Sequence, residues 1–238
     1  MEEWYSIGGF NDPMSSLSHL VGTVIFFVLS IYLLISARRS TKTLLYSLQF
    51  ALATLFLLSM SFVYHMMAED TTTRRVMVRM DIAAIFVMIA STFTAIHGIL
   101  FTGWRRWAVL LLLWTITVTG ITLRTVFFDN IPQIVGDGIF LLIGWIGAYS
   151  AFLLWKSFGW HGVRPILIGG LCYTLGVIIH ATKWPIIIDK VWGPHETFHL
   201  FVLAGLGAHW AFVWSIADGS FQRRLKRTIG VEETVANG

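Results

Sequence analysis

Charge is scarce in this chain of 238 residues, because only 13% of them are Asp, Glu, Lys or Arg. An average soluble domain has about 25%. Hydrophobic residues make up 56% of the chain and include 18 Phe and 11 Trp. So few charges leave too little polar surface to cover a soluble fold. The composition therefore excludes an ordinary soluble domain and indicates a protein that lies in a lipid bilayer.

Cysteine, long polar stretches and an N-terminal basic segment are also missing. The single cysteine, Cys172, excludes an internal disulfide framework and a cysteine-rich metal site. No stretch is long and polar enough for a nucleic-acid-binding domain, so nucleic acid is not an expected partner. The first sixteen residues contain no Lys or Arg. They therefore lack the basic region of a cleavable signal peptide, and we expect the first apolar span to be retained.

Seven apolar runs have the length of about 20 residues that a helix needs to cross the hydrocarbon core. Their limits are Leu17–Ala37, Leu44–Met66, Val76–Gly98, Trp107–Leu123, Ile134–Trp155, Pro165–Thr182 and Glu196–Ala217. We predict an all-α integral membrane protein, a bundle of seven transmembrane helices. Residues 17–217 would form this domain, after a short N-terminal segment (1–16) and before a basic C-terminal tail (218–238). The short connections, including those expected at 156–164 and 183–194, leave no room for a second domain.

Tryptophan and basic residues predict how the bundle sits in the membrane. Seven tryptophans lie near span ends, as an interfacial aromatic belt requires: Trp4, Trp104, Trp107, Trp155, Trp160, Trp184 and Trp192. An odd number of spans puts the termini on opposite sides, and the C-terminal side would hold eleven of the 17 basic residues. We therefore predict the N-terminus outside and the C-terminus in the cytoplasm. Four tail residues either anchor this topology or contact anionic lipid headgroups: Arg223, Arg224, Lys226 and Arg227.

Ionisable and other polar residues inside membrane helices are costly, so each one indicates a possible site. With helix directions alternating, six of them gather on the side of the N-terminus: His19, His65, Asp81, His180, His195 and His199. His195 and His199 are four residues apart and therefore project from one helix face. His65, at the end of the second span, would add a third imidazole. Three neutral nitrogen ligands with a fourth position open suit Zn²⁺.

Asp81 and Ser61 complete the expected site. Asp81 begins the third span at the depth of His65, and Ser61 lies one helical turn before His65. We expect the two side chains to hold a water molecule or to orient a ring, as catalytic residues of the site. Two other interpretations stay open: Asp81 forms an ion pair with Arg79, or the Ser61 hydroxyl bonds back to its own helix.

Residues 195–199 read HETFH and also satisfy the short zinc-protease pattern, in which Glu196 would be the general base. The extended pattern needs a glycine and a further histidine, but Val202 and Gly205 stand at those positions. An intramembrane metalloprotease is therefore the weaker interpretation.

Other histidines receive separate expectations. His19 lines the entrance of the site or caps the first helix at the interface. His209 lies about 15 Å deeper than His199, too far to share a metal, and is expected to be buried and hydrogen-bonded. His97 and His161, on the opposite side, are expected to be interfacial. Glycines of the sixth span, such as Gly169, are expected to allow close helix contact.

Taken together, several segments resemble the hemolysin III branch of the progestin and adipoQ receptor (PAQR) family. They are DPMSSLSHLVG (12–22), the Ser61-x-x-x-His65 pair, RMDIAAIFVMIASTFT (79–94), GGLCYTLGVIIHA (169–181) and HETFHLFVLAGLGAHW (195–210). The resemblance covers residues 12 to about 217. It implies a seven-helix membrane protein in which three histidines, here His65, His195 and His199, bind zinc, with a water molecule near Asp81. His180 stands where related sequences more often have an aromatic residue. Eukaryotic receptors of the family have a cytoplasmic N-terminus, opposite to the orientation that the charges of this chain predict.

These residues lead to hypotheses from different functional classes. The first is a zinc-dependent hydrolase of lipid amide or ester bonds, with ceramidase-like chemistry implied by the resemblance, in a bacterial inner membrane. The second is a receptor-like sensor or regulator of membrane lipid composition with structural zinc. A pore-forming cytolysin fits poorly, because seven retained spans make an integral protein and not a secreted toxin. In the first two hypotheses the partner is a membrane lipid.

Overall fold

The computed structural model describes residues 10–227, six of them between 133 and 146 by their backbone only. Trp4, most of the expected N-terminal segment and the end of the basic tail lie outside this range. The described chain is all-α, with one short 3-10 turn, η1 (Phe128–Asn130). The helices are α1 (Pro13–Ala37), α2 (Thr41–Met66), α3 (Thr72–Leu100), α4 (Trp104–Val126), α5 (Gln133–Thr182) and α6 (Pro194–Ala217). All six are long and apolar enough to cross a membrane.

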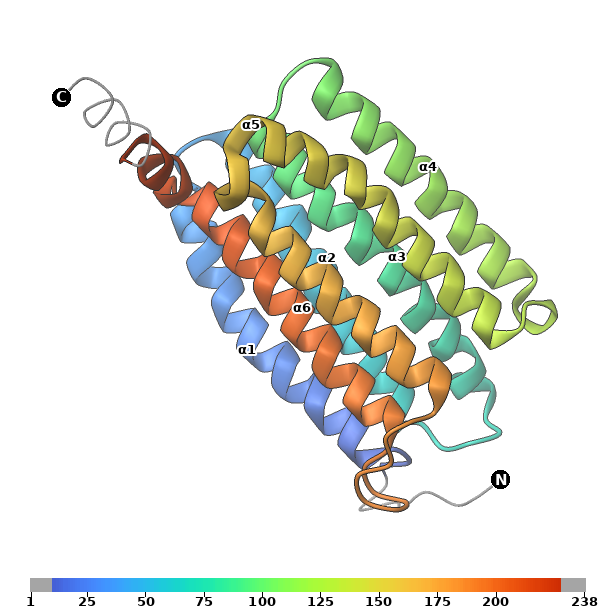
Figure 1. Cartoon of the computed structure of the whole chain (residues 1–238). Coiled ribbons are helices and arrows are strands. Elements are labelled where there is room, and N and C mark those ends of the chain that lie inside the picture. The colour runs from blue at the N-terminus through green and yellow to red at the C-terminus, as the bar shows by residue number, and fades with distance from the viewer. Residues whose placement is uncertain (1–9, 228–238) are drawn as a thin grey trace.

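The longest helix, α5, contributes two membrane-crossing legs. Gly159 interrupts it with φ 61° and ψ −155°, a conformation that favours glycine. The chain reverses there, so residues 133–158 and 160–182 run antiparallel (Figure 1). This reversal gives the predicted seven transmembrane segments and places residues 10 and 227 at opposite ends of the bundle (Figure 1). The loop expected at 156–164 is wrong in detail, because this stretch is helical on both sides of Gly159.

Local sequence explains where the helices start. Ser40 accepts a hydrogen bond from the backbone N–H of Thr43 (3.1 Å), and Thr71 does the same for Arg74 (3.1 Å). Pro13 starts α1, where a missing N–H costs nothing. Because lipid offers no hydrogen-bond partners, helices that satisfy their own backbone groups are the fold that such apolar runs require.

The helices pack as a bundle with α3 as the most buried of them (Figure 1). The core includes Phe50, Leu58 and Phe86, all fully buried. By contrast, large apolar side chains of α1 and α4 face outward, as expected for helices that contact lipid. Five of the six exposed tryptophans in the described residues lie near the ends of membrane-crossing segments, in agreement with the expected aromatic belt: Trp104, Trp107, Trp155, Trp160 and Trp184. The sixth, Trp145, lies in the middle of the first leg of α5.

Two histidines remote from the expected site stabilise helix contacts. His209 is buried near the Ile166 carbonyl (Nε2 to O, 3.4 Å), as predicted, and Gly169 leaves room for its ring. His97, expected to be interfacial, is instead fully buried. Its Nδ1 donates to the Arg105 carbonyl (3.2 Å), so its Nε2 accepts from the Ser150 hydroxyl (2.9 Å). This correction follows from tertiary packing, because α5 covers the end of α3.

Candidate metal centre

Three histidines from two helices converge at the end of the bundle where α2 ends and α6 begins. His65 projects from α2, and His195 and His199 project from α6. Each ring offers a nitrogen, and these three nitrogens all lie within 4.8 Å of one another. The Nε2 atoms of His65 and His195 are 3.2 Å apart. His65 and His199 are 97% and 98% buried, so this polar cluster lies inside the bundle.

Two of the three donors have the spacing of ligands on a tetrahedral metal ion. Ligand nitrogens about 2.0–2.1 Å from zinc in tetrahedral geometry are roughly 3.3 Å apart, close to the spacing of His65 and His195. In addition, His199 Nδ1 is buried and has no hydrogen-bond partner among the described residues. Buried polar atoms are mostly satisfied by a protein group, a water molecule or an ion. The cluster can therefore hold a metal ion.

Asp12 orients His65, a role that the sequence did not reveal. Its Oδ2 accepts hydrogen bonds from His65 Nδ1 (3.0 Å) and from Arg74 Nη2 (2.8 Å). Burial raises the pKa of Asp12, but the hydrogen bonds from His65 and Arg74 outweigh it and hold the pKa at about 2. The carboxylate is thus an acceptor, and His65 Nδ1 must be the donor. This leaves His65 Nε2 with its lone pair toward the cluster, the arrangement typical of metal-binding histidines.

Arg74 completes this support from α3. It donates to the Met67 carbonyl (2.6 Å) as well as to Asp12, and its guanidinium lies over the Tyr64 ring. The backbone N–H of Asp12 also donates to the His65 carbonyl (3.0 Å). These contacts join the start of α1, the end of α2 and the start of α3. The position of His65 is therefore set by three helices.

Ser61 and Asp81 lie beside the cluster. Ser61 is buried on α2 one turn before His65, and its hydroxyl interacts with the Asp81 carboxyl group on α3. Neither alternative interpretation describes this geometry. Arg79 forms an ion pair with Asp129 (3.8 Å, Nη2 to Oδ2), and the Ser61 hydroxyl interacts with Asp81 of another helix. A carboxyl group is thus available next to a potential metal ion.

His19 is part of the buried cluster and lies neither at its entrance nor at the interface. It is 97% buried and stacks on His199, with ring centroids 4.0 Å apart and planes 15° apart. Neither of its ring nitrogens has a hydrogen-bond partner among the described residues. The lone pair of a ring nitrogen lies in the plane of its ring. Because the rings of His19 and His199 are stacked in nearly parallel planes, their lone pairs do not point at one shared metal position. The ring of His19 instead holds the plane of His199.

Glu196 fastens the start of α6 to α1. Its carboxylate accepts hydrogen bonds from the Ser15 hydroxyl (2.8 Å) and from the backbone N–H of Gly193 (2.9 Å). Such a capped and buried carboxylate is typical of a helix N-terminus. This geometry supports a structural role and not the general base of a protease. His180, at the end of α5, packs against His195 with ring centroids 5.1 Å apart.

The site and fold together define a polytopic membrane protein with a three-histidine cluster that can hold a metal ion. The family model described as "Haemolysin-III related" matches residues 8–210, and the chain belongs to this family. It is similar to "Hemolysin-3" of Bacillus cereus, with 25% identity over 197 residues that cover 80% of this chain and 84% of that protein. It is also similar to the "Hemolysin-3 homolog" of Bacillus subtilis (strain 168), with 24% identity over 196 residues, 82% of this chain and 88% of that protein.

Proposed function

We propose that this protein is a zinc-dependent membrane hydrolase that cleaves an amide or ester bond of a lipid. The observation that supports this function is that the Ser61–Asp81 pair lies close to the three imidazoles. An all-nitrogen ligand set that leaves a coordination position open is the arrangement of many catalytic zinc ions. The apolar bundle around the site supports a lipid substrate, because an acyl chain needs an apolar environment.

Each residue has a distinct role in this proposal. His65, His195 and His199 hold the metal, which when bound supplies Lewis acidity toward a carbonyl group and toward water. Asp81 accepts the proton of the attacking water and passes it to the leaving group. Ser61 orients the Asp81 carboxyl group, with which its hydroxyl interacts.

The test is fatty acid release by the purified, zinc-loaded protein from ceramides, phospholipids and acyl amides. Removal of a general base lowers rates by about 10²–10⁴-fold, so Asp81→Asn should be nearly inactive while keeping its metal. His195→Ala should lose both metal and activity. His161→Ala is the matched control, because His161 is exposed at the other end of the bundle. No turnover on any of these lipids would contradict the hydrolase.

A second candidate is a sensor or regulator of membrane lipid composition with structural zinc. It is favoured by the contacts of His65, since a metal there would join α6 to the three helices that Asp12 and Arg74 already connect. In this case Asp81→Asn would keep its function in a lipid-homeostasis assay, and removal of zinc would lower the Tm.

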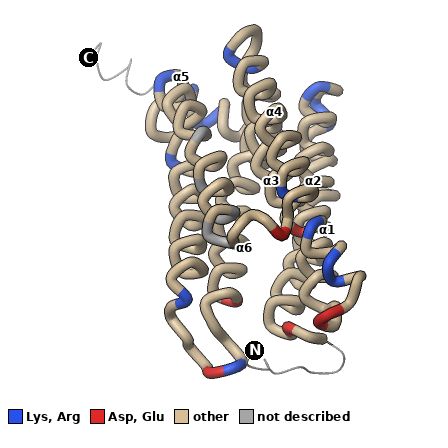
Figure 2. Tube along the Cα trace, turned by 90° about the vertical axis from the view of Figure 1, so that its right-hand side faces the viewer, with Lys and Arg blue, Asp and Glu red and all other residues tan. Residues whose placement is uncertain are grey.

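For location we propose a bacterial inner membrane with the N-terminus outside. Eleven of the 17 basic residues lie at the end of the bundle near the C-terminus. Figure 2 shows basic residues at both ends and acidic residues toward the end opposite the C-terminus. Cytoplasmic loops are enriched in Lys and Arg, which supports this orientation. A green fluorescent protein fused to the C-terminus should fluoresce, and an alkaline phosphatase fused there should be inactive. The reverse pattern would overturn the orientation.

A further inference from the structure

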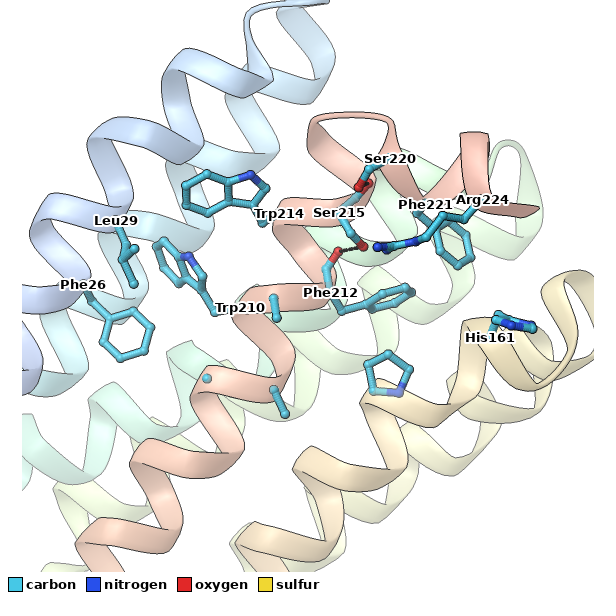
Figure 3. A pocket seen from close by; sticks show the side chains of 14 residues that line it. Phe26, Leu29, His161, Trp210, Phe212, Trp214, Ser215, Ser220, Phe221 and Arg224 are labelled. Carbon is cyan, nitrogen blue, oxygen red and sulfur yellow. Dashed lines mark hydrogen bonds between the residues drawn. The ribbon is translucent and has the colours of Figure 1, made fainter. Parts of the chain in front are cut away.

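A groove of about 640 Å³ lies at the end of α6 that is far from the histidine cluster (Figure 3). Small residues of α6 leave its floor open, namely Gly207, Ala208 and Ala211. Phe26 of α1 and Pro165 of α5 belong to its walls. A Cβ atom added to Gly207 would meet no atom within 4 Å, so the groove is open above this residue. Its lining suits an extended apolar chain.

A buried polar atom indicates what else the groove binds. Trp210 lines the groove and is 97% buried (Figure 3). Its indole N–H has no hydrogen-bond acceptor among the described residues. Buried indole N–H groups usually have an acceptor. Trp210 lies seven residues before the last residue of α6, which corresponds to about 10 Å along the helix. An acceptor is therefore needed somewhat below the membrane surface.

The mouth of the groove is basic. Arg224 and Ser220, from the helical segment 220–227 that follows α6, lie there (Figure 3). Eleven Lys and Arg residues lie at this end of the bundle, and Asp218 is the sole acidic residue there in the described chain. An occupant with a negatively charged end therefore complements the groove.

We propose that the groove binds one anionic phospholipid. The phosphate contacts Arg224, an ester carbonyl accepts the hydrogen bond of Trp210, and an acyl chain lies over Gly207, Ala208 and Ala211. The order of cation, donor and apolar surface along α6 matches the order of phosphate, ester and acyl chain in such a lipid. This site is separate from the metal centre, so it does not depend on the proposed hydrolase.

The test uses the full-length protein in nanodiscs of phosphatidylcholine with graded amounts of phosphatidylglycerol of the same acyl chains. Native mass spectrometry then measures which lipid stays bound after release. Phosphatidylglycerol should be retained preferentially. Because a basic residue near anionic lipid contributes about 1 kcal/mol, Arg224→Gln should weaken this retention about fivefold. Arg105→Gln, at an exposed position in the first turn of α4, is its control and should have no effect.

A second pair of variants separates groove binding from surface electrostatics. Gly207→Leu fills the groove and should abolish retention, whereas Gly170→Leu adds the same side chain at an equally open position outside it. Trp210→Phe removes the N–H, keeps the aromatic ring and should weaken retention at least twofold. Size-exclusion chromatography and the Tm report that each variant is folded. Equal retention of the two lipids, or full retention by folded Gly207→Leu and Trp210→Phe, would overturn the proposal.

Discussion

The two ends of α6 use polar residues in different ways. At its start, His199 and Glu196 are buried and His195 is half-buried, and all three meet side chains from other helices at defined distances. At its far end, the basic residues 223, 224, 226 and 227 are exposed. Buried polar groups need specific partners, because an unpaired one is costly. Exposed charges have no such specific partners, and they act mainly through the total charge of that surface. We therefore expect single substitutions to matter far more at the histidine end.

The largest effect is expected for the metal ligands. His199→Ala should lose the bound metal, because only two imidazoles of the cluster remain. His161→Ala, at the opposite end, should keep the full amount. Elemental analysis of both purified proteins, with size-exclusion chromatography as the test of folding, measures the difference. Equal metal content in the two variants would show that the histidine end of α6 is no more sensitive to substitution than the basic end.

The next effect concerns the residue that orients a ligand. Loss of a carboxylate that supports a metal-bound histidine typically costs about 10–100-fold in metal affinity. Asp12→Ala should weaken metal binding by this factor, since His65 Nδ1 and Arg74 lose their acceptor. Competition with a chromophoric chelator gives the affinity. Asp218→Ala, the acidic residue of the basic end, should leave it unchanged.

A smaller effect is expected on stability. Glu196→Ala removes the acceptor of the Ser15 hydroxyl and of the Gly193 N–H and should cost about 1–3 kcal/mol. The measured quantity is the Tm of the metal-free protein. Glu69→Ala, at an exposed position of the α2–α3 connection, should keep the Tm of the wild type. If both variants unfold at the same temperature, Glu196 does not stabilise the junction of α1 and α6.

The smallest effect is expected at the basic end. Arg105→Gln should change the free energy of unfolding by less than about 0.5 kcal/mol, because its side chain is exposed. Metal content should also be unchanged. A clear loss of stability in thermal unfolding would show that charges at this end act individually.

Much of the fold could be predicted because its signals are local. Each apolar run is long enough to cross the membrane whatever surrounds it, and the structure has a helix at every one. The reversal of α5 was harder to place, since the chain is helical directly before and directly after the single interrupting residue, Gly159. Spacing alone put His195 and His199 on one face. The grouping with His65 also followed, because alternating helices bring their ends to the same depth.

Other residues of the site could not be assigned in this way. Asp12 meets His65 across 53 positions of sequence, and His19 stacks on His199 across 180. Contacts of this kind depend on how each helix is rotated about its axis. His97 shows the same limit, since only the packing of α5 decides that it is buried. The rotation of a helix about its axis is set by how its whole face packs against other helices. The sequence of one helix alone therefore does not determine it.

The sequence by itself determined that this chain spans a membrane, how many times it crosses and which histidines can share a metal ion. These properties follow from hydrophobicity and helical period, which act over a few turns of one helix. The tertiary structure alone decided that Asp12 and Arg74 support His65, that Glu196 joins α6 to α1 and that a groove opens beside Trp210. Each of these depends on distances between helices, and such distances exist only once all the helices pack together.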